Sequence, residues 1–576
     1  MSGKTSASVR LTRLADRYAA FAARRAKPAA GFISQPEPRS IGLYARGKQM
    51  MAGNILLAGH LAEAPNAFLW DIHAPDPAFQ AEAQGFSWLD DLAALGTPVA
   101  RARAQDWTWG WIARHGSGAG VGWSPDLTGR RIIRWIHHAT LLLSGKDKVE
   151  TTAYYRSLSR QSDYLARRWQ AAAPGLPRFE ALTGLVYAGI SLMGMEKLVP
   201  AATAALAADC KTGIDSAGGL LTRNPEELLE VLTLLTWTAR ALTEAARPVP
   251  AEIVDAIARI AQSLRALRHA DGELARFQGG GKGLDGRLDQ ALAAAGLRTT
   301  PTPAVAMGFA RMSGRRTSVI VDAAAPPGGQ AMAAAHASTA AFELTSGRRA
   351  LIVSCGSGVP FGAAWRQAGR ATQSHSVLAM DKVSSSRFSK WAALNLTDRA
   401  SVTATRLGVG NGETELYLAH DGWLASHGLI ASRTLTLSAD GRRLTGVEAL
   451  TALTPEARRR FEEMMTASQL DGAGYTVRFH LHPEVDAALD MGGSAVSMAL
   501  RSGEVWVLRH SSPAKLSLQP SVYLEKGRLK PRPAIQIVLS GHALGFETRI
   551  DWTLAKAQDT PLAIRDFESG DPEGQG

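Results

Sequence analysis

The hydrophobic periodicity of the chain changes once, near residue 300, and this change constrains the fold more than any other feature. In the upstream segments 130–143 and 253–267, apolar residues recur three and four positions apart, as on one face of an α-helix. Downstream, short β-branched segments end at Gly, Asp or Ser, and apolar and polar residues alternate in 475–482. The sequence therefore predicts an α+β multidomain chain, with a helical array or toroid followed by a large antiparallel β-sandwich.

Four segments follow from this reading. The glycine-rich stretch at 279–300 is the expected boundary between helices and strands. One helix start is explicit, because Asn224 is a good N-cap, Pro225 takes the first helical position and Glu227 can complete a capping box. We expect a basic N-terminal segment at 1–64, an α/α toroid at 65–300, a β-sandwich at 301–560 and a disordered tail at 561–576.

Composition narrows the class of protein. Two cysteines in 576 residues, Cys210 and Cys355, exclude a disulfide framework and a cysteine-based zinc module. The net charge of +12 favours an anionic partner, which could be nucleic acid, a membrane surface or an acidic polymer. Nucleotide-binding, dinucleotide-binding, zinc-protease and serine-esterase motifs are missing from the sequence. A recognised nucleic-acid module is missing too, so we expect no nucleic-acid partner.

The N-terminus predicts a basic amphipathic helix and lacks the uninterrupted apolar run of a signal peptide, because Arg24 and Arg25 break it. A solvated helix is the favoured interpretation, with binding to an anionic surface as the alternative. The longest uncharged later segment, 181–195, is shorter than a membrane-spanning helix needs. We expect no transmembrane segment.

An ordered series of segments resembles the heparinase II/III family of polysaccharide lyases, over about residues 65–555. In the second half the resemblance rests on 335–358, 371–381 and 418–437, and in the helical half on 122–138 and 218–232. The family implies β-elimination of a uronate-containing anionic polysaccharide, heparin-like or another acidic glycan. Such chemistry needs donors that neutralise the uronate carboxylate, a base for the C5 proton and an acid for the leaving oxygen.

The resemblance supplies the catalytic candidates. His336 matches the histidine that opens the family's HxDxxxF-like strand and is expected to act as base or acid. A histidine that closes a packed strand is the alternative. Arg223 and Asn224 are expected to neutralise the substrate carboxylate, although the N-cap role alone explains Asn224. Leu220 stands where related sequences carry a polar residue, which favours a degenerate site. Tyr187 completes the catalytic candidates, with a core tyrosine as the alternative.

Substrate-binding candidates come from both halves. Arg276 and Gln278 lie in a loop before the boundary and could meet substrate charge, and His375 could line the site. Trp123 could stack on a sugar ring, although packing between helices is favoured for it and for its neighbours Trp107, Trp109 and Trp111. His480 and His482 have a spacing that can bind a metal from one strand face, but an ordinary polar face is favoured.

Ser338 occupies the position at which several family members carry a zinc-binding aspartate, which leaves His375 as the one candidate ligand. We therefore expect no required cofactor, with a structural zinc as the alternative. The predicted function is a carbon–oxygen lyase acting on an acidic polysaccharide. The alternative is a non-catalytic acidic-glycan-binding protein of the same fold, which Leu220 and Ser338 favour. A glycoside hydrolase would need two carboxylates that the sequence does not pair. We expect a cytoplasmic location, whereas the family favours the periplasm or cell envelope.

Overall fold

The structure is a computed structural model that describes residues 2–65, 68–118, 120–296, 304–381, 383–389 and 394–560. The predicted disordered tail at 561–576 lies outside these residues. The chain forms two compact units. The helical unit comprises 1–220, 227–261 and 284–297, and the β unit comprises 221–226, 262–283 and 298–576. Residues 221–226 and 262–283, which the sequence places in the toroid, thus cluster with the strands.

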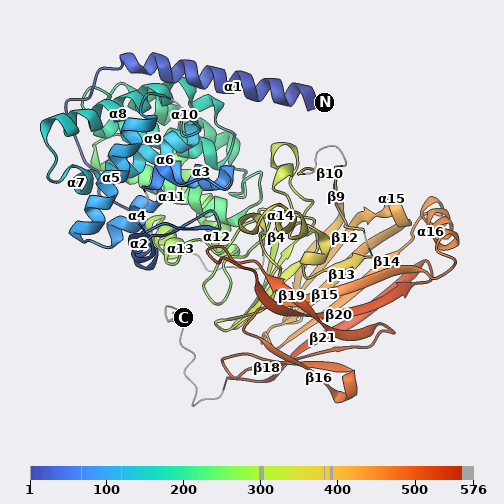
Figure 1. Cartoon of the computed structure of the whole chain (residues 1–576). Helices are drawn as coiled ribbons and strands as arrows, with labels where there is room; N and C mark the ends of the chain where they lie inside the picture. The colour runs from blue at the N-terminus through green and yellow to red at the C-terminus, as the bar shows by residue number, and fades with distance from the viewer. Residues whose placement is uncertain are drawn as a thin grey trace. The chain divides into compact units, whose positions relative to one another are not determined.

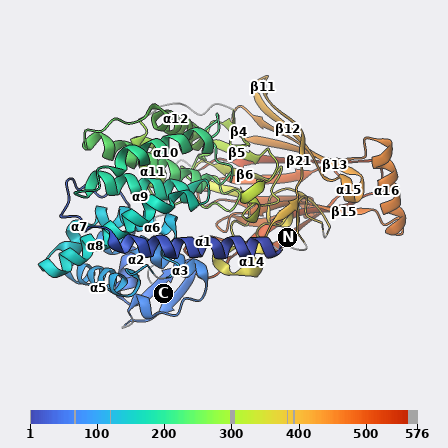
Figure 2. The same cartoon turned by 90° about the horizontal axis from the view of Figure 1, so that it is seen from above.

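Helices of the first unit begin where the sequence offers caps. Asp76, Thr97 and Asp147 each accept a hydrogen bond from a backbone N–H in the first turn, and Asp147 forms a full capping box with Glu150. The helices are α1 (Ser2–Ala22), α2 (Tyr44–Met51), α3 (Pro77–Gly85), α4 (Ser87–Ala94), α5 (Pro98–His115), α6 (Pro125–His137), α7 (Ala139–Leu143), α8 (Lys148–Arg168), α9 (Leu176–Ser191), α10 (Leu198–Gly213), α11 (Pro225–Glu244), α12 (Ala251–Ala266) and α13 (Arg287–Ala294). In Figure 2, α9, α10 and α11 run side by side.

The N-terminal segment packs within the helical unit. Asp16 of α1 forms an ion pair with Arg168 of α8 at 2.7 Å and accepts a hydrogen bond from Tyr164. Further along, the backbone N–H of Ala29 donates to the hydroxyl of Ser159. A short hairpin follows, formed by β1 (Asn54–Leu57) and β2 (His60–Glu63). Asp16 and Ala29 thus attach the N-terminal segment to α8, while residues 11–14, 17 and 18 of α1 are exposed, as expected for a solvated helix.

Aromatic side chains form much of the helical core. Phe86, Trp88, Trp111 and Trp135 are almost fully buried and contact one another at ring-centroid distances of 4.7–6.1 Å. Arg131 is buried among them, with its guanidinium 4.0 Å from the ring centroid of Trp111. These tryptophans of the helical half of the sequence therefore stabilise helix packing.

In its described residues the β unit contains two large antiparallel sheets (Figure 1) and a small two-stranded one, formed by β9 (Arg387–Phe388) and β10 (Leu396–Asp398). One sheet has the strand order β11-β12-β13-β14-β21-β18-β17-β16, and the other has the order β19-β20-β15-β7-β6-β5-β4-β3, with β8 paired to β15. The strands of the first sheet are β11 (Val402–Gly410), β12 (Glu413–Trp423), β13 (Leu429–Ser438), β14 (Arg443–Thr451), β16 (Asp486–Asp490), β17 (Ala495–Ala499), β18 (Val505–His510) and β21 (Glu547–Gln558). Those of the second are β3 (Ala304–Ala306), β4 (Phe309–Gly314), β5 (Thr317–Asp322), β6 (Phe342–Ser346), β7 (Arg349–Val353), β8 (Leu378–Met380), β15 (Ala473–Leu481), β19 (Lys515–Tyr523) and β20 (Arg532–Ala543).

The core of the β unit lies between the inner faces of these sheets. The alternation predicted in 475–482 appears in β15, where Val477, Phe479 and Leu481 are buried. They join one cluster with residues of the other sheet, such as Leu435 and Trp552. The helical insert predicted near 455–468 is α16 (Pro455–Ala467), which Thr454 caps. The expected order of a toroid and then an antiparallel sandwich is confirmed.

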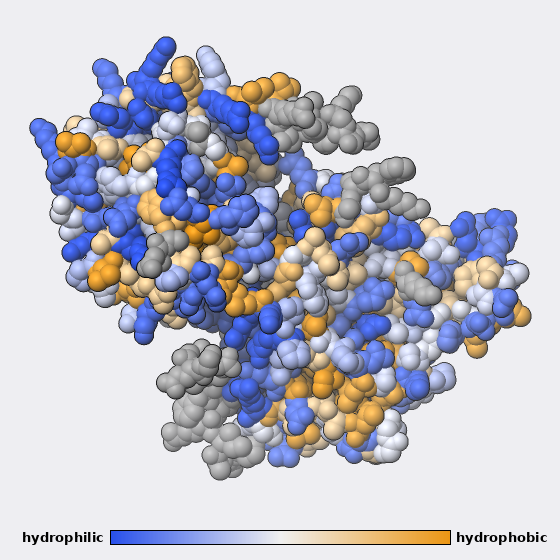
Figure 3. Space-filling view, viewed as in Figure 1, coloured by the Kyte–Doolittle hydropathy of each residue, from blue (hydrophilic) through white to orange (hydrophobic). Residues whose placement is uncertain are grey.

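Hydrophilic and hydrophobic residues are interspersed over the visible face of each unit (Figure 3). Among the described residues, no helix combines the length and apolar character needed to cross a membrane.

Candidate functional site

Two of the predicted catalytic residues, Arg223 and His336, and the substrate-binding candidate Gln278 meet in the β unit around the carboxylate of Asp322 at the end of β5. This carboxylate is completely buried. One oxygen accepts a hydrogen bond from Arg223 at 2.6 Å, and the other accepts from Ser338 at 2.6 Å and from Gln278 at 2.9 Å. Gln278 in turn accepts the backbone N–H of His336 at 2.8 Å. We call these five residues the Asp322 network.

Arg223 donates side-chain hydrogen bonds to the Asp322 carboxylate and to nearby backbone carbonyls. Its Nε donates to the carbonyl of Met307 at 3.0 Å, its Nη1 to Ala325 at 2.8 Å and its Nη2 to Gly308 at 2.9 Å as well as to Asp322. These bonds use all three nitrogens of the guanidinium within the β unit itself. Arg223 therefore holds loop backbone and a buried carboxylate together, and the geometry does not present it as a neutraliser of substrate charge.

Two members of the network have unusual backbone conformations. Arg223 has φ of +52° and Gln278 has φ of +50°, a region that residues other than glycine seldom adopt. Such strain persists only where surrounding contacts overdetermine the conformation, and the bonds to Asp322 supply those contacts. The hydrogen bonds of the network therefore offset the unfavourable free energy of these two backbone conformations.

His336 and His375 lie against each other, with ring centroids 5.4 Å apart. Both are nearly inaccessible, with 3% and 1% of their surface exposed. Burial, helped by the guanidinium of Arg370, lowers the pKa of His336 to about 3. Burial and the two neighbouring imidazoles of His336 and His480 also lower the pKa of His375. At neutral pH both rings are uncharged. The pKa of His336 lies well below the near-neutral value that favours proton abstraction, so His336 is a weak base.

The zinc site of some family members does not fit the residues present here. The Nδ1 of His336 and both ring nitrogens of His375 are buried without a hydrogen-bond partner, so two imidazoles could face a ligand. The third position holds Ser338, whose hydroxyl donates to Asp322, and the Asp322 carboxylate is bound by three donors. Within the described part of the chain, no three His, Cys, Asp or Glu side chains are placed to hold a metal ion.

The remaining β-unit candidates have local partners. The side chain of Asn224 accepts the backbone N–H of Glu226 at 3.0 Å, which matches the predicted cap of α11. Arg276 forms an ion pair with Glu273 at 2.6 Å and lies over the ring of Tyr523. Neither side chain is presented as a substrate ligand by these contacts.

Tyr187 and Trp123 belong to the core of the helical unit. Tyr187 is completely buried in α9 and packs edge-on against His137, and burial raises its pKa. The indole N–H of Trp123 donates to the carbonyl of His115 at 2.7 Å, while its ring packs against Tyr164. Both side chains thus have packing roles in the helical unit, whereas the Asp322 network belongs to the β unit.

His480 has the polar surroundings expected of that face of β15, but its side chain is buried. Its Nε2 lies 2.9 Å from the carbonyl of Gln373, and its Nδ1 lies 2.8 Å from the hydroxyl of Ser521 and 3.6 Å from the thiol of Cys355. His482 packs on the ring of Tyr523. The two histidines therefore have separate surroundings and do not form a metal-binding pair.

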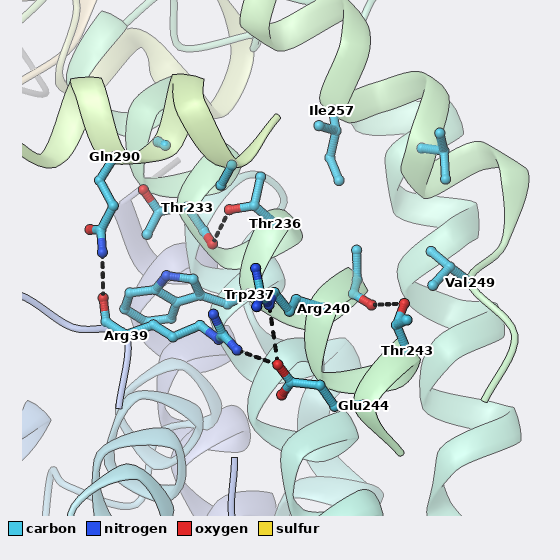
Figure 4. Close-up of a pocket in the computed structure, with 14 residues that line it drawn as sticks. Arg39, Thr233, Thr236, Trp237, Arg240, Thr243, Glu244, Val249, Ile257 and Gln290 are labelled. Atoms are coloured by element: carbon cyan, nitrogen blue, oxygen red, sulfur yellow. Dashed lines mark hydrogen bonds and ion pairs between the residues drawn. The ribbon is translucent and has the colours of Figure 1, made fainter. Parts of the chain in front are cut away.

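The helical unit contains a pocket of about 750 Å³, a size typical of small-molecule sites, that the sequence did not reveal (Figure 4). Arg39 and Arg240 both point to Glu244, at 2.6 and 3.1 Å, and the indole of Trp237 lies beside them. Gln290 donates to the carbonyl of Arg39 at 3.3 Å. The spacing of Arg240 and Glu244 on one helix signals their ion pair, but nothing local in the sequence connects Arg39 to them.

Comparisons with known proteins agree with this architecture. A family model described as Heparinase II/III-like, C-terminal, matches residues 296–553. FtsZ-localized protein C of Caulobacter vibrioides is 30% identical over 542 residues, which cover 92% of this chain and 91% of that protein.

Two solved structures share the fold at low sequence identity. Heparinase III superposes with a TM-score of 0.67 at 12% identity, covering 91% of this chain and 87% of its own. A mutant of the heparan sulfate lyase HepC of Pedobacter heparinus superposes with a TM-score of 0.58 at 14% identity, covering 98% of this chain and 91% of its own. With an α/α toroid, an antiparallel β-sandwich and a relative matched over nearly its full length, this chain belongs to the heparinase II/III-like family.

Proposed function

We propose that this protein is a non-catalytic member of the heparinase II/III-like family that acts by binding, with the division protein FtsZ as its partner. The observation that carries the first half is the Asp322 network, in which the arginine expected to neutralise substrate is used by carbonyl oxygens and a buried carboxylate. The second half rests on similarity to FtsZ-localized protein C over nearly the whole of both chains.

The electrostatics of the two histidines support a non-catalytic role. A base that removes a uronate C5 proton works best with a pKa near the working pH. Burial moves the pKa of His336 to about 3, and Tyr187 is packed in the helical core with its pKa raised. The catalytic candidates His336 and Tyr187 therefore lack the pKa values and the exposure that the elimination needs.

A polysaccharide lyase acting on an acidic glycan is the second candidate. The unpartnered, buried nitrogens of His336 and His375 favour it, because they lie where the family resemblance places catalytic and ligand histidines. This candidate would place the protein with its polymer in the periplasm or envelope. The FtsZ proposal instead requires a compartment shared with FtsZ, and we propose the cytoplasm.

Two assays on the full chain test these candidates. The first incubates the protein with a panel of uronate polysaccharides, with heparinase III as the positive control, and follows the absorbance of the C4–C5 double bond. We expect no unsaturated product from the wild type or from His336→Ala. Product that disappears in His336→Ala would overturn the non-catalytic role and establish the lyase.

The second assay sediments the protein with polymerised FtsZ. We expect it to pellet with the polymer and to stay in solution when FtsZ is unpolymerised or omitted. His336→Ala should pellet as the wild type does, because binding would not use the Asp322 network. A protein that stays in the supernatant with polymerised FtsZ would overturn the partner assignment, and retention on an immobilised acidic glycan without product would then favour the glycan-binding alternative.

A further inference from the structure

Three hairpins of the β unit carry the same Gly-Arg-Arg tripeptide at their tips. They are residues 314–316 between β4 and β5, 347–349 between β6 and β7, and 441–443 between β13 and β14. The first two belong to one sheet and the third to the other. A repeated Arg-Arg at hairpin tips concentrates positive charge where turn residues such as Asn, Asp and Gly are usually favoured.

The fold brings these tips together at one end of the sandwich. The backbone N–H of Gly347 donates to the carbonyl of Arg316 at 2.8 Å, and the hydroxyl of Thr317 donates to the carbonyl of Gly441 at 2.8 Å. Gly314 and Gly441 approach so closely that a Cβ on Gly441 would lie 2.0 Å from the carbonyl oxygen of Gly314. Only glycine permits this contact between the two sheets.

A pocket of about 440 Å³ lies at the first two tips. Arg311, Thr317 and Ser318 line it as buried residues, while the lining residues Arg315, Arg316 and Arg348 are exposed. Its remaining lining residues are Ala270, Ser313 and Gly347, so the described lining contains four arginines and no carboxylate. We call it the arginine pocket.

Arg311 sets a fixed positive charge in this pocket. Its Nε donates to Ser313 at 2.9 Å, and its Nη1 donates to the carbonyls of Ala266, at 3.1 Å, and of Arg268. Burial lowers its pKa to about 10, which leaves the guanidinium protonated at neutral pH. Its named hydrogen-bond acceptors are all neutral, so the charge is oriented without being cancelled by them.

The backbone of Arg315 adds an independent sign of function. It has φ of +44° as the first residue of a two-residue loop, a conformation that favours glycine or asparagine. Placing an arginine there is unfavourable for the turn, and setting it beside Arg316, Arg311 and Arg348 adds repulsion between like charges. Asp440 and Asp559, whose pKa values the charges of Arg315 and Arg316 help to lower, offset part of this repulsion. Strain that local structure does not require is characteristic of binding sites.

We propose that the arginine pocket binds a small, multiply charged oxyanion of the phosphate or sulfate type. Guanidinium groups present planar, paired N–H donors that match the oxygens of such groups, and an anion would relieve the repulsion among them. Ser313 also lines the pocket, and its hydroxyl, which accepts from Arg311, keeps its own proton for donation to an anion. This site goes beyond the proposed association with FtsZ and does not depend on it.

The third hairpin provides a matched control. Arg442 forms an ion pair with Asp559, and Arg443 forms one with Glu413 at 3.0 Å. Neither arginine lines the pocket, although both belong to the same tripeptide in the neighbouring tip. Removing this pair lowers the net charge of the protein by the same amount as removing Arg315 and Arg316.

The experiment titrates the full chain with inorganic pyrophosphate by calorimetry in a low-salt buffer free of phosphate. We expect the double variant Arg315→Gln, Arg316→Gln and the single variant Arg348→Gln to weaken binding by about tenfold or more, which corresponds to about 1.4 kcal/mol. The control Arg442→Gln, Arg443→Gln should stay within about twofold of the wild type. A parallel titration with inorganic sulfate identifies the source, because preference for pyrophosphate assigns phosphoryl groups and equal affinity assigns oxyanions in general.

Absence of pyrophosphate binding to the wild type would overturn the proposal. Equal weakening in the control hairpin would overturn it too, since that result means nonspecific attraction to the net charge. A failed titration would leave the sedimentation result with FtsZ unaffected, so the two proposals fail separately.

Discussion

The Asp322 network and the arginine pocket both contain arginine within one β unit, yet they use it in opposite ways. Arg223 is nearly buried and donates its hydrogen bonds to carbonyl oxygens and to a completely buried carboxylate. Arg315, Arg316 and Arg348 are exposed around a pocket whose described lining contains no acidic residue. A guanidinium whose donors all bond within the fold stabilises the fold, whereas exposed guanidinium groups that line one pocket can bind an external anion.

The largest expected effect comes from breaking the closed side of this comparison. Arg223→Met should lower the free energy of unfolding by about 3–5 kcal/mol, because it leaves the buried carboxylate of Asp322 without its cation. Denaturant unfolding measures the change. Adding Asp322→Asn should recover part of the loss, whereas Arg443→Met, which removes an exposed ion pair with Glu413, should cost less than about 1 kcal/mol. A loss as small in Arg223→Met would contradict the structural role.

A smaller effect should appear in the pH dependence of stability. The pKa of His336 is about 3 in the folded protein against an ordinary 6.5, so the unfolded chain binds a proton that the folded chain refuses between these values. This contribution to stability is present above pH 6.5 and is lost as the pH falls towards 3. From pH 7 to pH 5 it should amount to about 1–2 kcal/mol.

Comparing unfolding of the wild type and His336→Gln at pH 7 and pH 5 isolates that proton. The wild type should lose more stability on acidification than the variant does, because the buried His137 and His420 and the half-buried His482, whose pKa values are also lowered, are present in both proteins. The exposed His542 provides the control substitution His542→Gln, which should leave the difference between the two pH values unchanged. Identical acid sensitivity in wild type and His336→Gln would contradict the burial of a neutral imidazole.

The smallest change in the free energy of unfolding is expected at the arginine pocket, where the sign of the change tests the proposal. Arg315→Gly should raise the free energy of unfolding by about 0.5–1 kcal/mol, because glycine adopts φ of +44° without the Cβ clash that arginine suffers. The same variant should weaken pyrophosphate binding. The matched control is Arg442→Gly, because Arg442 lies in the third hairpin tip with a negative φ and forms an ion pair with Asp559. A destabilised Arg315→Gly would show that the turn needs its arginine for folding.

Local sequence patterns predicted the elements well, because each depends on neighbours along the chain. The helical start at Asn224, the α16 insert and the alternation in β15 were all visible as caps and periodicity. The tryptophans at 107, 111 and 123 were correctly favoured as packing residues. The resemblance also led to His336, Gln278 and Arg223, three residues that the structure does bring together.

Their roles could not be predicted in the same way. Whether Arg223 neutralises a ligand or a carboxylate of its own depends on Asp322, which is 99 residues away in the chain. The departure at Ser338 signalled a changed site, but only the structure shows that its hydroxyl is bonded to that same carboxylate. The pocket with Arg39 and Trp237 was missed because its residues come from segments far apart in the sequence.

The high positive charge illustrates the same division. By itself the sequence determined the two-part architecture, the family and a surplus of 12 positive charges, because periodicity, ordered motifs and composition are properties of the chain. Tertiary structure decided which arginines bond within the buried part of the fold and which line a pocket at its surface. The donors of the nearly buried Arg223 bond to carbonyl oxygens. The exposed Arg315, Arg316 and Arg348 line a pocket where two hairpin tips meet. The physical reason is that the availability of a charge depends on its desolvation and its neighbours, and both exist only once distant segments have packed together.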